Sequence, residues 1–133
     1  MENKYEIIKR KTQKYFQYKN RAKAKEIHFS LTLPEFIQLT TAHCYICGVS
    51  GDEVDLGVDR LRNNSGYIFF NVAPCCFICN RAKNDMPFTE FKKWLKRINP
   101  NHRLCKDTKV DFSQLQNKKI LKKFIPSSNG NSQ

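Results

Sequence analysis

The sequence predicts a small α+β domain that is held together by a zinc ion. Two Cys-x-x-Cys pairs, Cys44 with Cys47 and Cys76 with Cys79, have the spacing of thiolate ligands in a tetrahedral zinc site. Apolar runs of strand type lie between the two pairs, and segments rich in helix-forming residues lie outside them. At 133 residues the chain suits one domain, and a metal ion compensates for a modest core.

The chain is strongly basic, which favours a polyanionic partner. Lys and Arg number 24 against 12 Asp and Glu, so the formal net charge is +12 and the pI is near 9.6. Because each neutralised phosphate releases a counterion, such an excess is typical of nucleic-acid-binding proteins. A soluble lysine-rich protein without such a partner would have a similar composition, and this alternative stays open at this point.

No apolar run has the length of a membrane span, and no signal-peptide core follows the first residues. We therefore expect no membrane partner and an intracellular, reducing compartment, either the cytoplasm or the nucleus of a eukaryotic or virus-infected cell. In such a compartment paired cysteines indicate metal binding rather than disulfide bonds. The adjacent Cys75 and Cys76 both could supply the third ligand. We choose Cys76 because it repeats the two-residue gap, which leaves Cys75 and Cys105 as free thiols.

The first part of the chain, residues 1–25, is predicted to form a basic helix. Residues 3–25 lack Pro and Gly and are rich in Lys, Arg, Gln and Ala, and Glu6 is the only acidic residue between Lys4 and Lys25. This helix can pack aromatic side chains on the core and can also follow a phosphate backbone.

Residues 26–98 are predicted to form the core. A short strand is expected over 26–29, and the capping box Thr32-Leu33-Pro34-Glu35 begins a helix that ends near residue 42. Alternation over 54–58 predicts a half-buried strand that ends at Asp59 and Arg60, with the apolar run 67–70 as its partner. A short helix from Phe77 carries Asn80, Arg81 and Lys83, and a helix packed on the core follows Pro87 and stops at Asn99-Pro100.

The order of these motifs resembles the HNH endonuclease family, in its zinc-knuckle branch. The resemblance covers roughly residues 28–98 and rests on Cys-x-x-Cys-Gly, a strand that ends in Asp plus a basic residue, and Asn-Val-x-Pro-Cys-Cys-x-x-Cys-Asn-Arg-x-Lys. It implies a ββα-metal core, in which two strands and a helix hold a divalent ion, Mg²⁺ or Mn²⁺, against the scissile phosphate. Zinc bound by the four cysteines would hold the frame.

The resemblance also assigns roles to individual residues. Asp59 and Asn80 match the ligands of the catalytic ion, Asn71 matches the asparagine that braces the loop, and Lys83, together with Arg81, is placed to meet a phosphate. Arg60 stands where the family usually has a histidine that acts as general base. A guanidinium stays protonated and cannot accept that proton, but it can bind a phosphate oxygen or stabilise transition-state charge.

Four other side chains could accept the proton in place of Arg60, and the sequence favours none of them. They are Asp55, Asp85, His28 and His43.

The remainder of the chain is predicted to be a basic helical extension over 99–125 and a disordered tail over 126–133. A capping box at 111–114 begins the expected helix, and the tail is rich in Ser, Asn and Gly.

The resemblance and the charge together predict a divalent-metal-dependent endonuclease or nickase that hydrolyses phosphodiester bonds, with double-stranded DNA as the expected partner and no small-molecule cofactor. The main alternative is a catalytically inactive, zinc-containing module that binds DNA or RNA. An ion pair between Arg60 and a metal-free Asp59 would favour this alternative. A third possibility is an adaptor whose basic surface meets an acidic protein, with binding that depends less on salt.

Overall fold

The computed structural model describes residues 2–105, and the statements below concern these residues. The chain is α+β, as predicted. Its elements in order are α1 (Lys4–Ala24), α2 (Leu33–Thr40), β1 (Gly57–Arg60), a 3₁₀ turn (Phe69–Asn71), β2 (Val72–Cys75), α3 (Phe77–Lys83) and α4 (Phe88–Ile98). None of the helices in this part of the chain is long and apolar enough to cross a membrane. The helix and tail expected after residue 105 lie outside the described residues.

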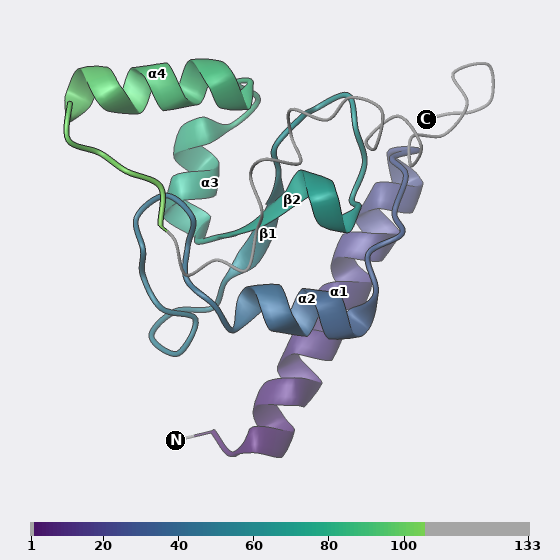
Figure 1. Ribbon diagram of the computed structural model, residues 1–133. Helices are drawn as coiled ribbons and strands as arrows, with labels where there is room; N and C mark the ends of the chain where they lie inside the picture. Colours follow the sequence, from purple (N-terminus) through teal and green to yellow (C-terminus); the bar gives the residue numbers. More distant parts are fainter. Residues whose placement is uncertain (1, 106–133) are drawn as a thin grey trace.

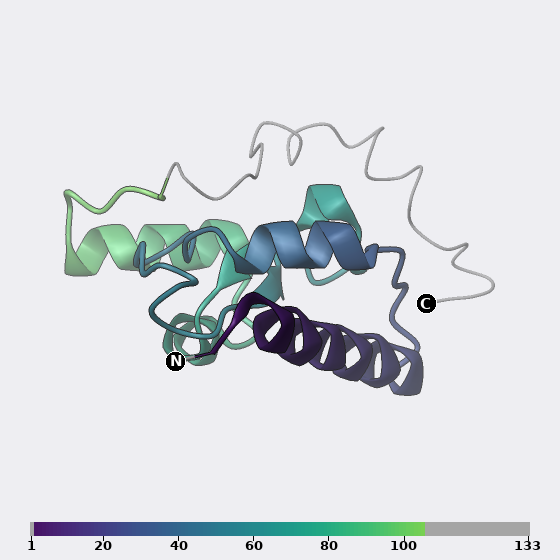
Figure 2. The same ribbon diagram turned by 90° about the horizontal axis from the view of Figure 1, so that it is seen from below.

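The hairpin formed by β1 and β2 lies at the centre of the molecule (Figure 1). The two strands are antiparallel, with Asp59 opposite Ala73 and Gly57 opposite Cys75. Helix α2 lies against both α1 and the hairpin, and α3 follows directly from β2. Figure 2 shows α4 and α1 at opposite ends of the molecule, as in the first view.

Helices α1 and α2 each begin at a capping box. Thr32 and Glu35 form the predicted capping box, with Pro34 in the first turn, and α2 ends at Thr40, two residues before the expected end. Asn3 and Glu6 form a second capping box at the start of α1. The predicted basic helix near the N-terminus and the short helix from Phe77 are both present.

The predicted strand pairing is wrong. The run 67–70 does not pair with β1; the partner is β2, which the sequence analysis treated only as a lead into the second cysteine pair. The expected strand over 26–29 is reduced to a single bridge between Phe29 and Tyr67. The backbone groups of Tyr67 are hydrogen-bonded to this segment and not to β1: its N–H donates to His28 O, and its carbonyl accepts from Leu31 N. Pro74 has no N–H, and a two-stranded sheet tolerates it because both strands are edges.

Two apolar clusters lie on the two faces of the hairpin. Alternate strand residues point to opposite faces, so Val58 and Val72 contact one cluster, which α1 and α2 cover with Tyr15, Phe36 and Leu39. The second cluster contains Cys44, the first ligand of the first cysteine pair, and reaches α4. Its buried members include Tyr45, Leu56, Ala73, Cys75 and Phe91. Asp59 shares its face of the hairpin with Ala73 and is therefore directed toward this second cluster.

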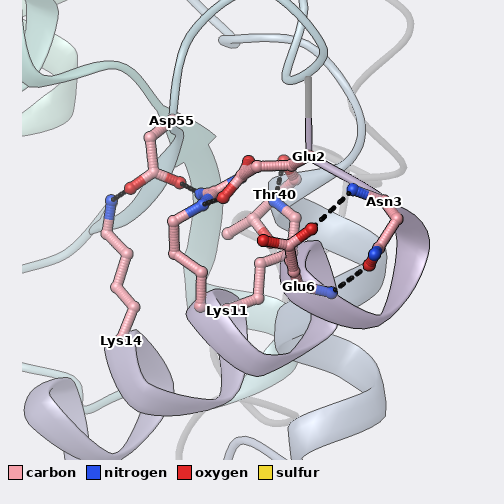
Figure 3. A network of polar contacts seen from close by, with 8 residues as sticks. Glu2, Asn3, Glu6, Lys11, Lys14, Thr40 and Asp55 are labelled. Carbon is pink, nitrogen blue, oxygen red and sulfur yellow. Dashed lines mark hydrogen bonds and ion pairs between the residues drawn. The ribbon is translucent and has the colours of Figure 1, made fainter.

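Polar contacts fix α1 onto the rest of the fold (Figure 3). Arg10 Nη1 lies 2.5 Å from Asp55 Oδ1, and Lys14 Nζ lies 2.9 Å from Asp55 Oδ2. Lys11 is buried, and its ammonium donates to Thr40 O at 3.0 Å. Burial lowers the pKa of Lys11. Part of the basic charge of α1 therefore supports the fold and is not presented to a partner.

Candidate functional site

The four cysteines predicted as metal ligands come together at one end of the hairpin. The Sγ atoms of Cys44, Cys47, Cys76 and Cys79 all lie within 4.8 Å of one another. Cys47 Sγ and Cys76 Sγ are 3.8 Å apart, which matches the edge of about 3.8 Å of a tetrahedron whose ligands lie about 2.3 Å from a zinc ion. The cluster can thus hold a metal ion such as zinc, and the choice of Cys76 over Cys75 agrees with the structure.

Local structure positions these thiols. Cys76 is the N-cap of α3, where its Sγ accepts a hydrogen bond from Cys79 N at 3.4 Å. The first pair lies in a tight turn that returns at Gly48, whose φ of +80° favours glycine. Cys75 lies beside the cluster, and hydrogen bonds from the thiols of Cys75 and Cys79 lower the pKa of Cys44.

Asp59 lies at the end of β1 and is only 7% exposed. Tyr45 Oη donates to Asp59 Oδ2 at 2.7 Å, and Lys83 Nζ lies 3.3 Å from both carboxylate oxygens. Burial raises the pKa of Asp59, while the charge of Lys83 and the hydrogen bond from Tyr45 oppose that rise. Burial and the neighbouring carboxylate raise the pKa of Tyr45, which keeps the phenol protonated as the donor.

Lys83 does not lie where the predicted phosphate contact requires it. Its side chain is 1% exposed, and its ammonium donates to Asp59 Oδ1 and to Arg60 O at 3.2 Å. The last turn of α3, after Cys79, directs the Lys83 side chain toward Asp59 and the backbone of Arg60 and away from solvent. Its charge neutralises Asp59 within the protein and is not presented to a phosphate.

A groove of about 350 Å³ opens beside Asp59, between β1, α3 and the C-terminal end of α1. Four of the predicted site residues line it together, namely Asp59, Arg60, Asn80 and Arg81. Two cationic side chains from α1 and its C-cap, Arg21 and Lys25, line it as well. The groove therefore combines two carboxylates, those of Asp59 and Asp85, and three side-chain amides with four cationic groups.

Arg60 is held by the turn that follows β1. Its Nη1 donates to Asn63 O at 3.0 Å and to Ser65 O at 3.3 Å, and its guanidinium lies 5.5 Å from the centroid of the Tyr67 ring. Arg60 is thus directed to backbone carbonyls and an aromatic ring. The ion pair with Asp59 that the sequence analysis considered for Arg60 is made by Lys83.

Asn71 is fully buried and does not line the groove. Its Oδ1 accepts from Arg62 N at 2.9 Å, and its Nδ2 donates to Arg62 O and Gly66 O, both at 3.0 Å. These three bonds tie the loop after β1 to the start of β2. Asn71 therefore braces the loop that carries the carbonyl acceptors of Arg60.

Asp85 is the one of the four candidate bases that lines the groove. Asp55 is instead paired with Arg10 and Lys14 of α1 and does not line the groove. The backbone of His28 pairs with Tyr67, and His43 lies in a bridge with Ser50 next to the cysteine cluster.

Sequence reasoning missed several residues of this surface. No site role was predicted for Arg21 or Lys25, although the basic charge of the N-terminal segment was a visible signal. Sequence reasoning had no signal for Phe77, which is 69% exposed at the edge of the groove. It also treated α4 only as core. Phe91 is buried as predicted, but Ile98 is 62% exposed, and a second open cavity of about 460 Å³ is lined by Thr89, Lys92, Lys93, Lys96 and Arg97.

Comparisons with known proteins add one relative. No protein-family model and no solved structure matches the chain. An uncharacterized protein of Acanthamoeba polyphaga mimivirus is 38% identical over 78 residues, which is 59% of this chain and 15% of the viral protein. The matched segment spans only a small part of the viral protein's length, and the similarity assigns no activity.

Proposed function

We propose that this protein is a divalent-metal-dependent endonuclease or nickase of HNH type that hydrolyses phosphodiester bonds in nucleic acid, with DNA as the first candidate substrate. The observation that carries the proposal is the groove in which Asp59 and Asn80 lie among Arg21, Lys25, Arg60 and Arg81. The succession of β1, β2 and α3 supports a ββα-metal core. In this proposal the four-cysteine cluster holds a structural zinc ion.

The donor atoms of the groove suit a hard divalent cation. Mg²⁺ and Mn²⁺ prefer carboxylate and amide oxygens, which Asp59 and Asn80 supply. Asp59 accepts hydrogen bonds from Tyr45 and Lys83, but an ionised carboxylate has about four lone-pair sites, so acceptor capacity remains. When bound, such an ion lowers the pKa of water and offsets charge on the scissile phosphate.

The groups of the chain itself have separate tasks. Arg60 and Arg81 bind the phosphate oxygens, and the carbonyls of Asn63 and Ser65 fix the guanidinium of Arg60 before substrate arrives. Asp85 is the side chain in the groove that can accept a proton from water. Asn71 maintains the loop on which this arrangement depends.

A binding module without catalysis is the second candidate, and the Lys83–Asp59 ion pair favours it. The Lys83 ammonium contacts both carboxylate oxygens, so the charge of Asp59 is already compensated inside the protein. A site of this kind needs no metal ion for charge balance. The cationic groove would then hold phosphates only by electrostatic attraction and hydrogen bonds.

The test is the nicking of supercoiled plasmid with Mg²⁺ or Mn²⁺, with and without EDTA. We expect metal-dependent nicking that Asn80→Ala abolishes and that Arg60→Ala reduces by roughly 10²-fold, the usual effect of losing one donor to transition-state charge. Asn64→Ala is the matched control, because Asn64 is an exposed asparagine that does not line the groove.

The two candidates give opposite results. No cleavage with either metal, together with salt-sensitive retention of the plasmid, would establish the binding module. In that case a gain of cleavage in Arg60→His would identify the missing base as the reason for inactivity.

A further inference from the structure

Three arginine side chains in the groove each lie over an aromatic ring. A guanidinium held on a ring face in this way is pre-positioned by cation–π attraction. The distances from guanidinium carbon to ring centroid are 4.8 Å for Arg21 on Tyr18, 5.5 Å for Arg60 on Tyr67 and 5.4 Å for Arg81 on Phe77, and all six residues line the cavity.

The rings of Tyr18 and Tyr67 are built into the fold. Tyr18 packs against Phe36 and Tyr67, with ring centroids 5.5 and 6.0 Å away, and Tyr67 packs against Phe29 at 5.4 Å. Burial raises the pKa of Tyr18 to about 12, in agreement with an enclosed ring. These two fixed rings position the guanidinium groups of Arg21 and Arg60 through cation–π contacts.

Phe77 differs from the two tyrosines. It is the first residue of α3, 69% of its surface is exposed, and Arg81 one turn later lies on its ring. A large exposed aromatic side chain beside a cationic groove can stack on a nucleobase, since every base has a π-face. A strand whose phosphate is held by Arg60 and Arg81 would carry its base within reach of Phe77, because all three residues line one cavity.

We propose that Phe77, backed by Arg81, is a stacking platform for an unpaired nucleobase, so that the groove takes a single strand or a locally unstacked strand. This inference rests on the proposed function in that it requires a nucleic acid partner, and it names the form of the strand that the site prefers. Charge favours this partner over an apolar protein segment. Four cations line the groove against two carboxylates, and one of these, Asp59, is already paired with Lys83.

The neighbouring Ile78 provides a matched control. It is 77% exposed and lies on the same helix, but it does not line the groove. A general apolar docking patch on α3 would use Ile78 as much as Phe77. A stacking platform would use Phe77 alone, because an aliphatic side chain has no π-face.

The experiment measures the binding of a short oligonucleotide with a central 2-aminopurine, in buffer without added Mg²⁺ or Mn²⁺ and without chelator, so that no metal-dependent hydrolysis occurs and the cysteine cluster keeps its metal. Wild type, Phe77→Ala, Phe77→Trp and Ile78→Ala are titrated against the single strand and its duplex at several salt concentrations. We expect Phe77→Ala to weaken single-strand binding about tenfold without changing the salt dependence, because no phosphate contact is lost. Phe77→Trp should retain affinity and quench the 2-aminopurine fluorescence, and Ile78→Ala should behave as wild type.

Three results would overturn the inference while leaving the proposed function standing: unchanged single-strand affinity in Phe77→Ala, an equal loss in Ile78→Ala, or an equal loss for the duplex. Far-ultraviolet circular dichroism of each variant verifies folding, which truncation of an exposed side chain should preserve. If the wild-type protein shows no salt-sensitive binding to either oligonucleotide, the proposed function itself fails, and this inference fails with it.

Discussion

Tyr45 donates a 2.7 Å hydrogen bond to Asp59 and thereby joins the cysteine cluster to the groove. Tyr45 lies between Cys44 and Cys47, both members of the cluster, and its N–H donates to Pro74 O in β2 at 2.8 Å. The position of the phenol therefore depends on the turn that the cluster organises. Loss of a metal from the cluster should disturb Asp59 as well as the fold.

Metal content should distinguish the two adjacent cysteines. We expect Cys76→Ser to lose the bound zinc and to lower the melting temperature by more than about 10 °C, because a structural zinc contributes several kcal/mol and each kcal/mol is worth about 4–8 °C in a small domain. Cys75→Ser should keep its zinc, since Cys75 is not one of the four clustered thiols. Elemental analysis and thermal melting with and without a chelator measure both effects. Zinc lost from Cys75→Ser but retained by Cys76→Ser would contradict the assignment.

The buried Lys83–Asp59 ion pair should show strong coupling in a double-mutant cycle. Lys83→Met leaves the carboxylate with Tyr45 as its remaining donor among the contacts described above, and we expect it to lower the free energy of unfolding by about 3–5 kcal/mol. Asp59→Asn combined with Lys83→Met should recover most of that loss, because no unpaired charge stays buried. Urea unfolding measures all variants, and additive losses would show that the two residues are independent.

The loss in Lys83→Met should also depend on pH. Burial raises the pKa of Asp59, and the first effect that opposes this rise is the charge of Lys83. Without that charge the pKa rises further, so the neutral carboxyl is the form that the folded state accepts. A raised folded pKa stabilises the protein at low pH, and that stability is lost as pH rises through the folded pKa. The difference in the free energy of unfolding between wild type and Lys83→Met should therefore be smallest at acidic pH.

Asp55 should give the opposite pH dependence. Burial acts to raise its pKa, but the hydrogen bond from Lys14 and the charges of Lys14 and Arg10 outweigh it, so the pKa lies below its ordinary value of 3.8. A lowered folded pKa contributes stability above the unfolded pKa, and this stability is lost as pH falls through the folded pKa. At neutral pH we expect the free energy of unfolding of wild type to exceed that of Asp55→Asn by about 0.2–1 kcal/mol for each of these partly exposed ion pairs. This difference should decline below about pH 4.

Asp52→Asn is the control for this prediction. It removes the same charge three residues earlier, where, within the described residues, the carboxylate makes no ion pair. Urea unfolding at a series of pH values measures both variants. A difference between wild type and Asp55→Asn that does not change between pH 7 and pH 3 would show that these ion pairs do not stabilise the docking of α1.

The features that sequence reasoning predicted correctly depend on short stretches of chain. The two-residue gaps select Cys44, Cys47, Cys76 and Cys79, because a Cys-x-x-Cys turn places two thiols on one metal ion whatever surrounds it. The capping box at Thr32 positions the start of α2 through hydrogen bonds that span three residues. Asp59 lies near the end of a strand as predicted, but the expected alternation is absent: β1 begins at Gly57, not at residue 54, and Gly57, Val58 and Asp59 are all buried.

What the tertiary structure decided involves residues that are far apart in the chain. The run 67–70 and β2 are both apolar, so the sequence does not distinguish which of them pairs with β1. In the structure Tyr67 bonds to the segment after α1, and β2 pairs with β1. Helical spacing put Lys83 near Asn80, but its burial against Asp59, 24 residues away, depends on how α3 closes over the hairpin. The exposure of Phe77 and the hydrogen bonds from Arg60 to the carbonyls of the turn after β1 also depend on how distant segments pack together. Desolvation and strand pairing are set by the segments that cover a residue, and the residue's own neighbours in sequence do not contain that information.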